Sequence, residues 1–109
     1  MAETLKVLAQ IIPTAGLLTD GYTVPAAGRA VVSSIAVCNQ DVLATTFRIS
    51  VAVAGASDNT KQYIYRDPSI QANATLMATV GMTLGPGDVV RVYSANGLVS
   101  FNFFGSEIS

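Results

Sequence analysis

Apolar side chains recur at every second position in the clearest segments of the chain. The regularly spaced apolar residues are Phe47, Ile49, Val51 and Val53 in the first segment, and Leu76, Ala78, Val80, Met82 and Leu84 in the second. Polar residues fill most of the positions between them. A repeat of two is the side-chain period of a β-strand. Both segments are therefore predicted to be strands with one face inward.

Turn signals divide the rest of the chain. Gly85-Pro86-Gly87-Asp88 predicts a chain reversal, because proline fixes its own φ and glycine tolerates positive φ. Ala95-Asn96-Gly97 predicts a type I′ hairpin. We expect "DVVRVYS" and "LVSFNFFGSEI" to be the antiparallel strands that follow these turns. Weaker strand patterns cover residues 4–10, 17–24 (bent at Asp20-Gly21), 29–39 and 61–66.

The fold class follows from this count of about eight strands. No segment of 12 residues has the apolar spacing of an amphipathic helix, so we expect an all-β protein. A single sheet would leave half of its apolar residues exposed to solvent, which favours a two-sheet sandwich or a barrel. We predict one domain over residues 1–109, an antiparallel β-sandwich of jelly-roll type. Residues 1–13 are predicted to form either an N-terminal arm or an edge strand, and residues 105–109 are a second candidate arm.

The segment "GRAVVSSIAVCNQ", residues 28–40, contains one charge, Arg29. Neither face of a strand over 29–39 would be charged, so we expect it to be central in its sheet and covered, at least in part, on both sides. Cys38, the only cysteine, is expected to be a small buried apolar residue. Phe101 and Phe103 are expected in the core. What covers the outer side of this strand is the question that bears on function.

Charge and residue inventory exclude several function classes. Charged residues make up 12% of the chain against 50% hydrophobic, and the net charge is -1 with no basic run. We therefore expect no nucleic-acid partner. No apolar run approaches the roughly 20 residues of a membrane helix, so no membrane partner is expected either. The chain has no histidine, and its carboxylates are scattered. We expect no enzyme, cofactor or metal site.

Tyr63 and Tyr65 are the candidate contact residues. Their spacing predicts that they share one strand face with Lys61, a layout that could stack on sugar rings or contact a partner. Ordinary packing within the sheet is the alternative interpretation. A glycan ligand therefore remains open at this point.

A resemblance to a known family rests on four segments: LLTDGYTVPAAGRAVVSSIAVCNQ, ATTFRISVAVAGA, KQYIYRDPSIQANAT and GDVVRVYSANGLVSFNFFGSEIS. They resemble a family of small virion structural proteins of tailed bacteriophages, including phages of cyanobacteria and marine bacteria. The recurring features lie at Tyr22 to Ala26, Val31 to Asn39, Phe47 to Val51 and Ser100 to Ile108. The resemblance covers nearly the whole chain and brings no catalytic or cofactor residues.

The resemblance implies a non-enzymatic virion component made in the cytoplasm of the host bacterium. It implies contacts with other copies of the chain and with other virion proteins, either as capsid decoration or cement or in association with the tail and its fibres. The alternative is a carbohydrate-binding module that attaches the phage tail to its host. A low charge content agrees with the first interpretation, because neighbouring subunits cover uncharged surface.

Overall fold

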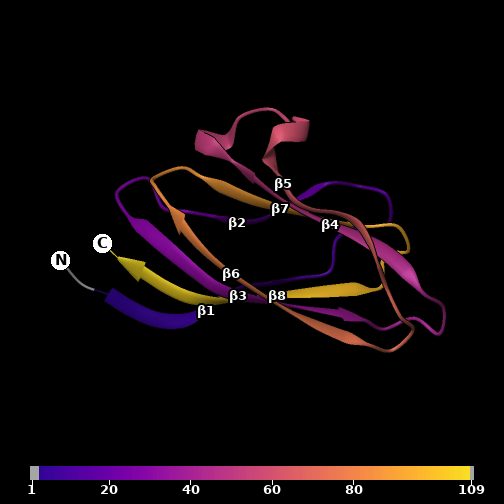
Figure 1. Ribbon diagram of the computed structural model, residues 1–109. Coiled ribbons are helices and arrows are strands. Elements are labelled where there is room, and N and C mark those ends of the chain that lie inside the picture. The colour runs from indigo at the N-terminus through magenta and orange to yellow at the C-terminus, as the bar shows by residue number, and fades with distance from the viewer. Residues whose placement is uncertain (1–2, 109) are drawn as a thin grey trace.

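Two four-stranded antiparallel sheets make up the protein (Figure 1). The computed structural model describes residues 3–108. The strands are β1 (Glu3–Ile11), β2 (Thr19–Thr23), β3 (Arg29–Asn39), β4 (Thr45–Ala52), β5 (Tyr63–Ile70), β6 (Thr75–Leu84), β7 (Val89–Ser94) and β8 (Val99–Ile108). The helical elements in this range are two short 3₁₀ turns, η1 (Val53–Gly55) and η2 (Thr60–Gln62). Within residues 3–108, no helix has the length and apolar character needed to span a membrane.

The sheets have the strand orders β1-β8-β3-β6 and β2-β7-β4-β5. Each strand pairs with the one that has the same rank counted from the other end of the chain: β1 with β8, β2 with β7, β3 with β6 and β4 with β5. A long hairpin rolled into two layers gives this pairing, which is that of a jelly roll. The predicted all-β sandwich of about eight strands is confirmed.

The core lies between the two sheets and is built on aromatic and branched side chains. Phe47, Phe101 and Phe103 are fully buried, and the rings of Phe47 and Phe101 meet edge to face with centroids 6.2 Å apart. Strand β3 lies between β8 and β6, so its predicted central position is confirmed. Its inward residues Ile35 and Val37 are fully buried. The predicted core positions of Phe101 and Phe103 are confirmed as well.

The predicted chain reversal at residues 85–88 is confirmed, but the predicted hairpin at residues 95–97 is wrong. The turn at residues 85–88 joins β6 to β7, and the turn at residues 95–98 joins β7 to β8, but in each case the two strands belong to different sheets. Gly97 has positive φ and Asn96 does not, so the second turn is not type I′. Turn residues encode a reversal of the chain direction. Whether the next strand pairs beside the last one or crosses to the opposite layer depends on how the apolar faces pack.

Two side chains depart from their predicted burial. Val53 is 70% exposed, because strand β4 ends at Ala52 and the backbone takes a positive φ at Ala54. Cys38 is half-buried and lies outside the core. Its neighbours Val37 and Asn39 are fully buried, so the alternation of β3 directs Cys38 to the outer side of the sheet.

The candidate arms are strands of the sandwich in the described range. Strand β1 is an edge strand that pairs with β8 of the same chain, and Gly105 to Ile108 complete β8. Met1, Ala2 and Ser109, at the outer ends of the two candidate arms, lie outside the described residues.

Strands β1, β3 and β6 are irregular at one common level of their sheet. The register shifts between Val7 and Ala9 in β1, and between Val32 and Ser34 in β3 against both neighbouring strands. The Ser33 hydroxyl donates to the carbonyl of Phe104 in β8 across this step, at 3.0 Å. Gly105 of β8 lies so close to β3 that a Cβ there would stand 1.9 Å from the carbonyl oxygen of Val31. Bulges bend and twist a sheet, so this level is where the layer curves.

Candidate interaction surfaces

Four loops gather at one end of the sandwich, the right-hand end in Figure 1: residues 12–18, 40–44, 71–74 and 95–98. Among them are five large apolar side chains whose exposure ranges from 47% to 77%. They are Ile12, Leu17, Val42, Leu43 and Leu98. Asp41 is the one charged residue in these four loops. We call this surface the apolar loop end.

Asn39 holds these loops together from inside. Its side chain is fully buried, and its Nδ2 lies within hydrogen-bonding distance of the carbonyl oxygens of Leu43 (3.0 Å), Ile70 (3.3 Å) and Gln71 (3.1 Å). Its Oδ1 accepts from the backbone N–H of Asp41 at 3.0 Å and from Nδ2 of Asn96 at 3.3 Å. One buried amide therefore links three of the four loops.

Further hydrogen bonds tie the loops to one another. The N–H of Gln40 donates to the carbonyl of Leu98 at 2.9 Å, and the N–H of Asn73 donates to the carbonyl of Asp41 at 3.1 Å. The fourth loop is anchored through the N–H of Gly16, which donates to Ser94 at 2.9 Å. The backbone of the apolar loop end is thus fixed by hydrogen bonds, while its large apolar side chains point outward.

Sequence reasoning missed Asn39, although a signal was present. Positions 35, 37 and 39 share the inward side of the strand, so Asn39 is a polar residue at a core position. A buried amide must find hydrogen-bond partners, and loop carbonyls are the usual ones at the end of a strand.

The outer side of the β1-β8-β3-β6 sheet is a second surface, and we call it the uncharged face. The strand register places its residues: Leu5, Val7 and Gln10 of β1; Ser100, Asn102 and Phe104 of β8; Val31, Ser34, Ala36 and Cys38 of β3; Thr75, Met77, Thr79 and Thr83 of β6. Charged residues on this side, Glu3 and Arg29, occur only in the row that pairs with Ile108 at the far end of the sheet. Figure 1 shows no segment of the described chain crossing this side.

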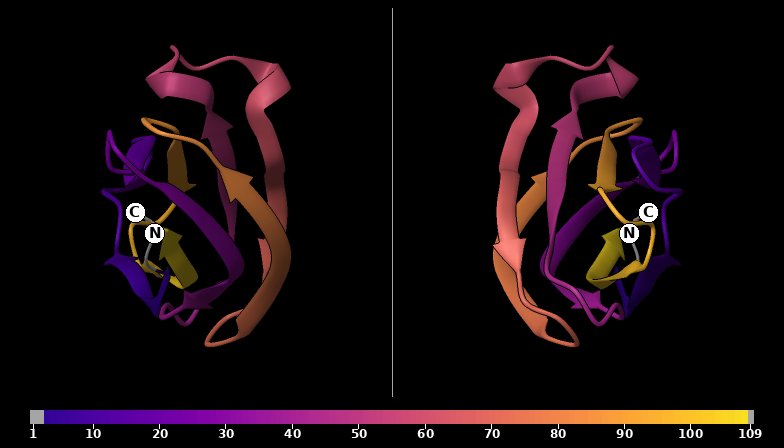
Figure 2. Two further views of the ribbon diagram at one scale, coloured as in Figure 1. Left: turned by 90° about the vertical axis from the view of Figure 1, so that its left-hand side faces the viewer. Right: turned by 90° about the vertical axis from the view of Figure 1, so that its right-hand side faces the viewer.

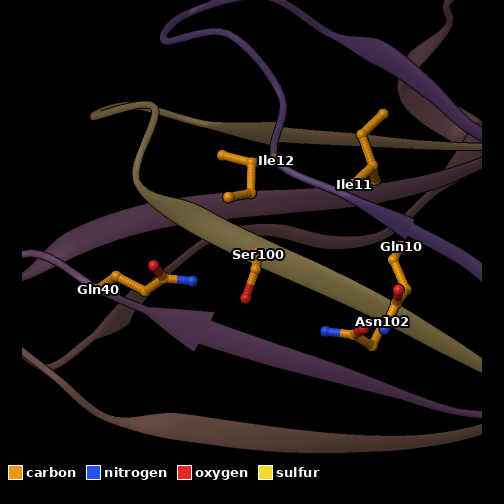
Figure 3. Close-up of a pocket in the computed structure, with 6 residues that line it drawn as sticks. All are labelled: Gln10, Ile11, Ile12, Gln40, Ser100 and Asn102. Atoms are coloured by element: carbon orange, nitrogen blue, oxygen red, sulfur yellow. The ribbon is translucent and has the colours of Figure 1, made fainter.

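A hollow of about 370 Å³ lies where the uncharged face meets the apolar loop end (Figure 3). Its lining consists of Gln10, Ile11, Ile12, Gln40, Ser100 and Asn102. Ser100 and Asn102 project from the same side of β8, and the register pairs Asn102 with Gln10. Within residues 3–108, none of the four polar side chains has a hydrogen-bond partner. The hollow therefore offers neutral donors and acceptors beside an isoleucine pair.

The outer side of the β2-β7-β4-β5 sheet is charged, in contrast. Arg48 forms a two-pronged ion pair with Asp67, at 2.7 and 3.1 Å, and its guanidinium lies 4.4 Å from the ring centroid of Tyr93. The bond from Arg48 lowers the pKa of the Asp67 carboxyl below its ordinary value. Arg91 pairs with Asp20 at 3.0 Å on the same sheet. The two outer sides of the sandwich thus differ sharply in charge.

Tyr63 and Tyr65 do not share a face, so that expectation is wrong. The register pairs Tyr65 with Ile49 and Tyr63 with Ser50, which are consecutive residues of β4 and point to opposite sides. Tyr65 packs against Phe47 of the core, with ring centroids 5.8 Å apart. Tyr63 lies on the outer side under the guanidinium of Arg66, 4.9 Å from its ring centroid. Lys61 belongs to η2 instead of the strand.

The segment 53–62, which contains η1 and η2, stands at the top of both views in Figure 2. Arg91 holds it by donating to the carbonyls of Ala56 at 2.8 Å and Gly55 at 3.4 Å. Asp88 accepts from the N–H of Ala54 at 2.9 Å. The charged sheet is therefore partly occupied by a segment of its own chain.

Among residues 3–108, no three His, Cys, Asp or Glu side chains gather as a set that could hold a metal ion. In comparisons with known proteins, no family model matches the chain, and neither a curated protein nor a solved structure matches it.

Proposed function

We propose that the protein is a non-enzymatic structural component of a tailed-phage particle. It acts through protein–protein contacts as a small surface or accessory subunit, in capsid decoration or cement or in association with the tail. The resemblance in sequence suggests the particle. The distribution of charge and apolar surface supports the mode of action.

The observation that carries this proposal is the apolar loop end. Large apolar side chains exposed together on a rigid support are typical of a surface that another protein covers. In a flexible loop, the backbone would also lose conformational entropy on binding, which would weaken the contact. Here the Asn39 hydrogen bonds have already fixed the backbone, so docking orders little more than side chains.

The first experiment is a search for the chain in purified particles of the phage that encodes it. We expect mass spectrometry to detect it at a fixed, high copy number, and immunogold labelling to place it on the head or the tail. Particles that lack the chain would overturn the proposal.

A competition experiment tests the loop end itself. Infected cells would supply a tagged copy of the chain as wild type, Val42→Asp or Val53→Asp. Val42 and Val53 are 77% and 70% exposed, and they lie at opposite ends of the sandwich, so the two variants are closely matched. We expect Val42→Asp to enter particles about tenfold less often than wild type, and Val53→Asp to enter as wild type does. Equal incorporation of both variants would show that the loop end is not the contact.

Glycan binding by a host-attachment module is the second candidate. The neutral hollow supports it, because amide and hydroxyl groups without internal partners can bond to sugar hydroxyls. A glycan array is the test, with Asn102→Ala for the hollow and Tyr63→Ala for the charged sheet. Binding that Asn102→Ala abolishes would favour this candidate, and an array without binding would exclude the tested glycans.

A further inference from the structure

We infer that two copies of the chain pack with their uncharged faces against each other. This inference rests on the proposed function in assembly and names the partner for one surface of the sandwich. The surface is the outer side of the β1-β8-β3-β6 sheet, and the occupant is a second copy of the same sheet.

Charge is the first argument for a second copy. In a two-fold symmetric contact, a patch meets itself, so any net charge on it is repelled by the same charge on its partner. The face from Leu5 to Gln10 on β1, and across β8, β3 and β6, carries no charged residue. Two ion pairs, Arg48 with Asp67 and Arg91 with Asp20, lie on the other sheet. The pair between Lys6 and Glu107 belongs to this sheet, but Lys6 lies opposite Gly105 and Val32 and therefore on the inner side. Two copies of the uncharged face can therefore meet without repulsion between like charges.

Area is the second argument. At ~3.3 Å per residue and ~4.8 Å between strands, the part of the face without charge, from Val31 to Cys38 on β3 and four strands wide, measures about 26 by 19 Å. This gives roughly 500 Å² per copy and roughly 1,000 Å² for a pair, which is the size of a weak and reversible interface.

The chemistry of the face is the third argument. Met77 and Val7 are about half exposed there, with Ala36, Val31 and Phe104 half-buried beside them. Threonines and an asparagine occupy the positions between, which is the mixture of apolar and neutral polar groups found in subunit contacts. An anionic partner such as a nucleic acid or a lipid headgroup would need cations, and this face has none between its Leu5 and Gln10 rows.

The strand β3 is consistent with this arrangement. Its inner side packs in the core, while its outer residues Ala36 and Cys38 have no charge and no covering segment within the described chain. The run "VVSSIAVC" thus presents an apolar side to the core and a neutral side to the second copy.

Sedimentation velocity of the full chain between about 1 µM and 1 mM is the test. We expect the wild type to be a dimer that dissociates on dilution. Thr79 is exposed midway along β6, beside Ser34 of the central strand β3, so Thr79→Arg places a charge on the face without burying it in the single copy. We expect that variant to dimerise about 100-fold more weakly. Ala56→Arg, at an exposed position of the segment 53–62, is the control and should dimerise as wild type does.

Cys38 provides a readout that needs no substitution. Its thiol lies on the uncharged face and is half-buried in a single copy, so the second copy should slow its alkylation by a maleimide. We expect alkylation at least tenfold slower at dimer-forming concentrations, and monomer-like rates in Thr79→Arg at any concentration. A wild type that is monomeric at 1 mM, or a dimer that survives Thr79→Arg with Cys38 equally reactive, would overturn the inference.

The two proposals fail in different ways. A chain that is present in particles but monomeric in solution overturns the two-fold packing and leaves the proposed function intact. A chain that dimerises through this face but is absent from particles overturns the proposed function alone.

Discussion

The side-chain amide of Asn39 donates to the carbonyl oxygen of Leu43 at 3.0 Å, so a fully buried polar group fixes a loop whose leucine stays on the surface. The same nitrogen lies 3.1 Å from the carbonyl of Gln71 in the next loop. The hydrogen bonds of Asn39 thus hold in place the backbone of the loops that carry the exposed apolar side chains, Val42 and Leu43 among them.

Replacement of Asn39 by alanine should destabilise the protein and loosen this end. The change leaves the buried carbonyl of Ile70 and the partly buried carbonyls of Leu43 and Gln71 without their donor, which should lower the free energy of unfolding by about 3 kcal/mol. Urea denaturation measures this. The neighbouring exposed side chain provides the control, since Gln40→Ala should cost less than about 0.5 kcal/mol. Equal effects of the two changes would contradict the role given to Asn39.

Gly105 should tolerate no side chain. A Cβ there would stand 1.9 Å from the carbonyl oxygen of Val31, and backbone in the middle of a sheet has little room to move. Gly105→Ala should therefore cost more than about 3 kcal/mol, or give an insoluble chain. Gly16→Ala is the matched change: it meets no atom within 4 Å, but Gly16 has a φ of +71°. It should cost about 1 kcal/mol from backbone strain alone, as measured by thermal unfolding of both variants.

Arg91→Ala should release the segment 53–62 from the charged sheet. Two bonds from this guanidinium, to the carbonyls of Ala56 and Gly55, hold the segment, and a third, to Asp20 of β2, orients the guanidinium. We expect amide hydrogen exchange at Ala56 and Gln62 to become at least tenfold faster, with a loss of only about 1 kcal/mol in global stability, because the core is untouched. Arg66→Ala, which removes a guanidinium stacked on Tyr63, should leave these amides unchanged. Exchange rates equal to wild type in Arg91→Ala would show that other contacts hold the segment.

Acid should weaken the end of the sandwich where Glu107 lies. Lys6 pairs with Glu107 at 2.8 Å and the hydroxyl of Tyr22 donates to it, and these contacts lower the pKa of Glu107 below its ordinary value of 4.5. The unfolded chain therefore binds the proton more readily than the folded chain. The stabilisation is complete above pH 4.5 and is lost as pH falls through the lower folded-state pKa.

The measurement is the free energy of unfolding from pH 7 to pH 2, for wild type and Glu107→Gln. We expect the free energy of unfolding of Glu107→Gln to fall less than that of wild type as the pH is lowered below 4.5. At the alkaline end, burial and the bond to Glu107 raise the pKa of Tyr22 above 10.0, so its contribution should be present below pH 10 and fall as pH rises further. Tyr22→Phe should remove that alkaline loss. Identical pH profiles in wild type and both variants would contradict the assignment.

Strand positions could be predicted from the sequence, because burial alternates locally. The pattern Phe47, Ile49 and Val51 needs no knowledge of the partner strand, only that one side of the segment is inward. Strand partners could not be predicted in the same way. Of the four pairs formed by rank, only β4 with β5 joins neighbours in sequence, and the others connect segments far apart along the chain.

The candidate surfaces could not be predicted from the sequence either, because their composition depends on which strands pair. Charge is segregated between two sheets, and this becomes visible only when Arg48 and Arg91 are known to lie in one sheet and Ala36 and Thr79 in the other. Tyr63 and Tyr65 lie on opposite sides of the sheet because the register of β5 against β4 shifts between Ile49 and Ser50. The spacing of residues along β5 gives no sign of this shift. Asn39 was the one site residue that the inward positions of its strand could have revealed.

The placement of β8 between β1 and β3 has a consequence for biosynthesis. A ribosome delivers β1 and β3 before the ten residues of β8 that both must bind, so their facing edges stay open until β8 has been made. The uncharged face can therefore assemble only after β8 has been synthesised.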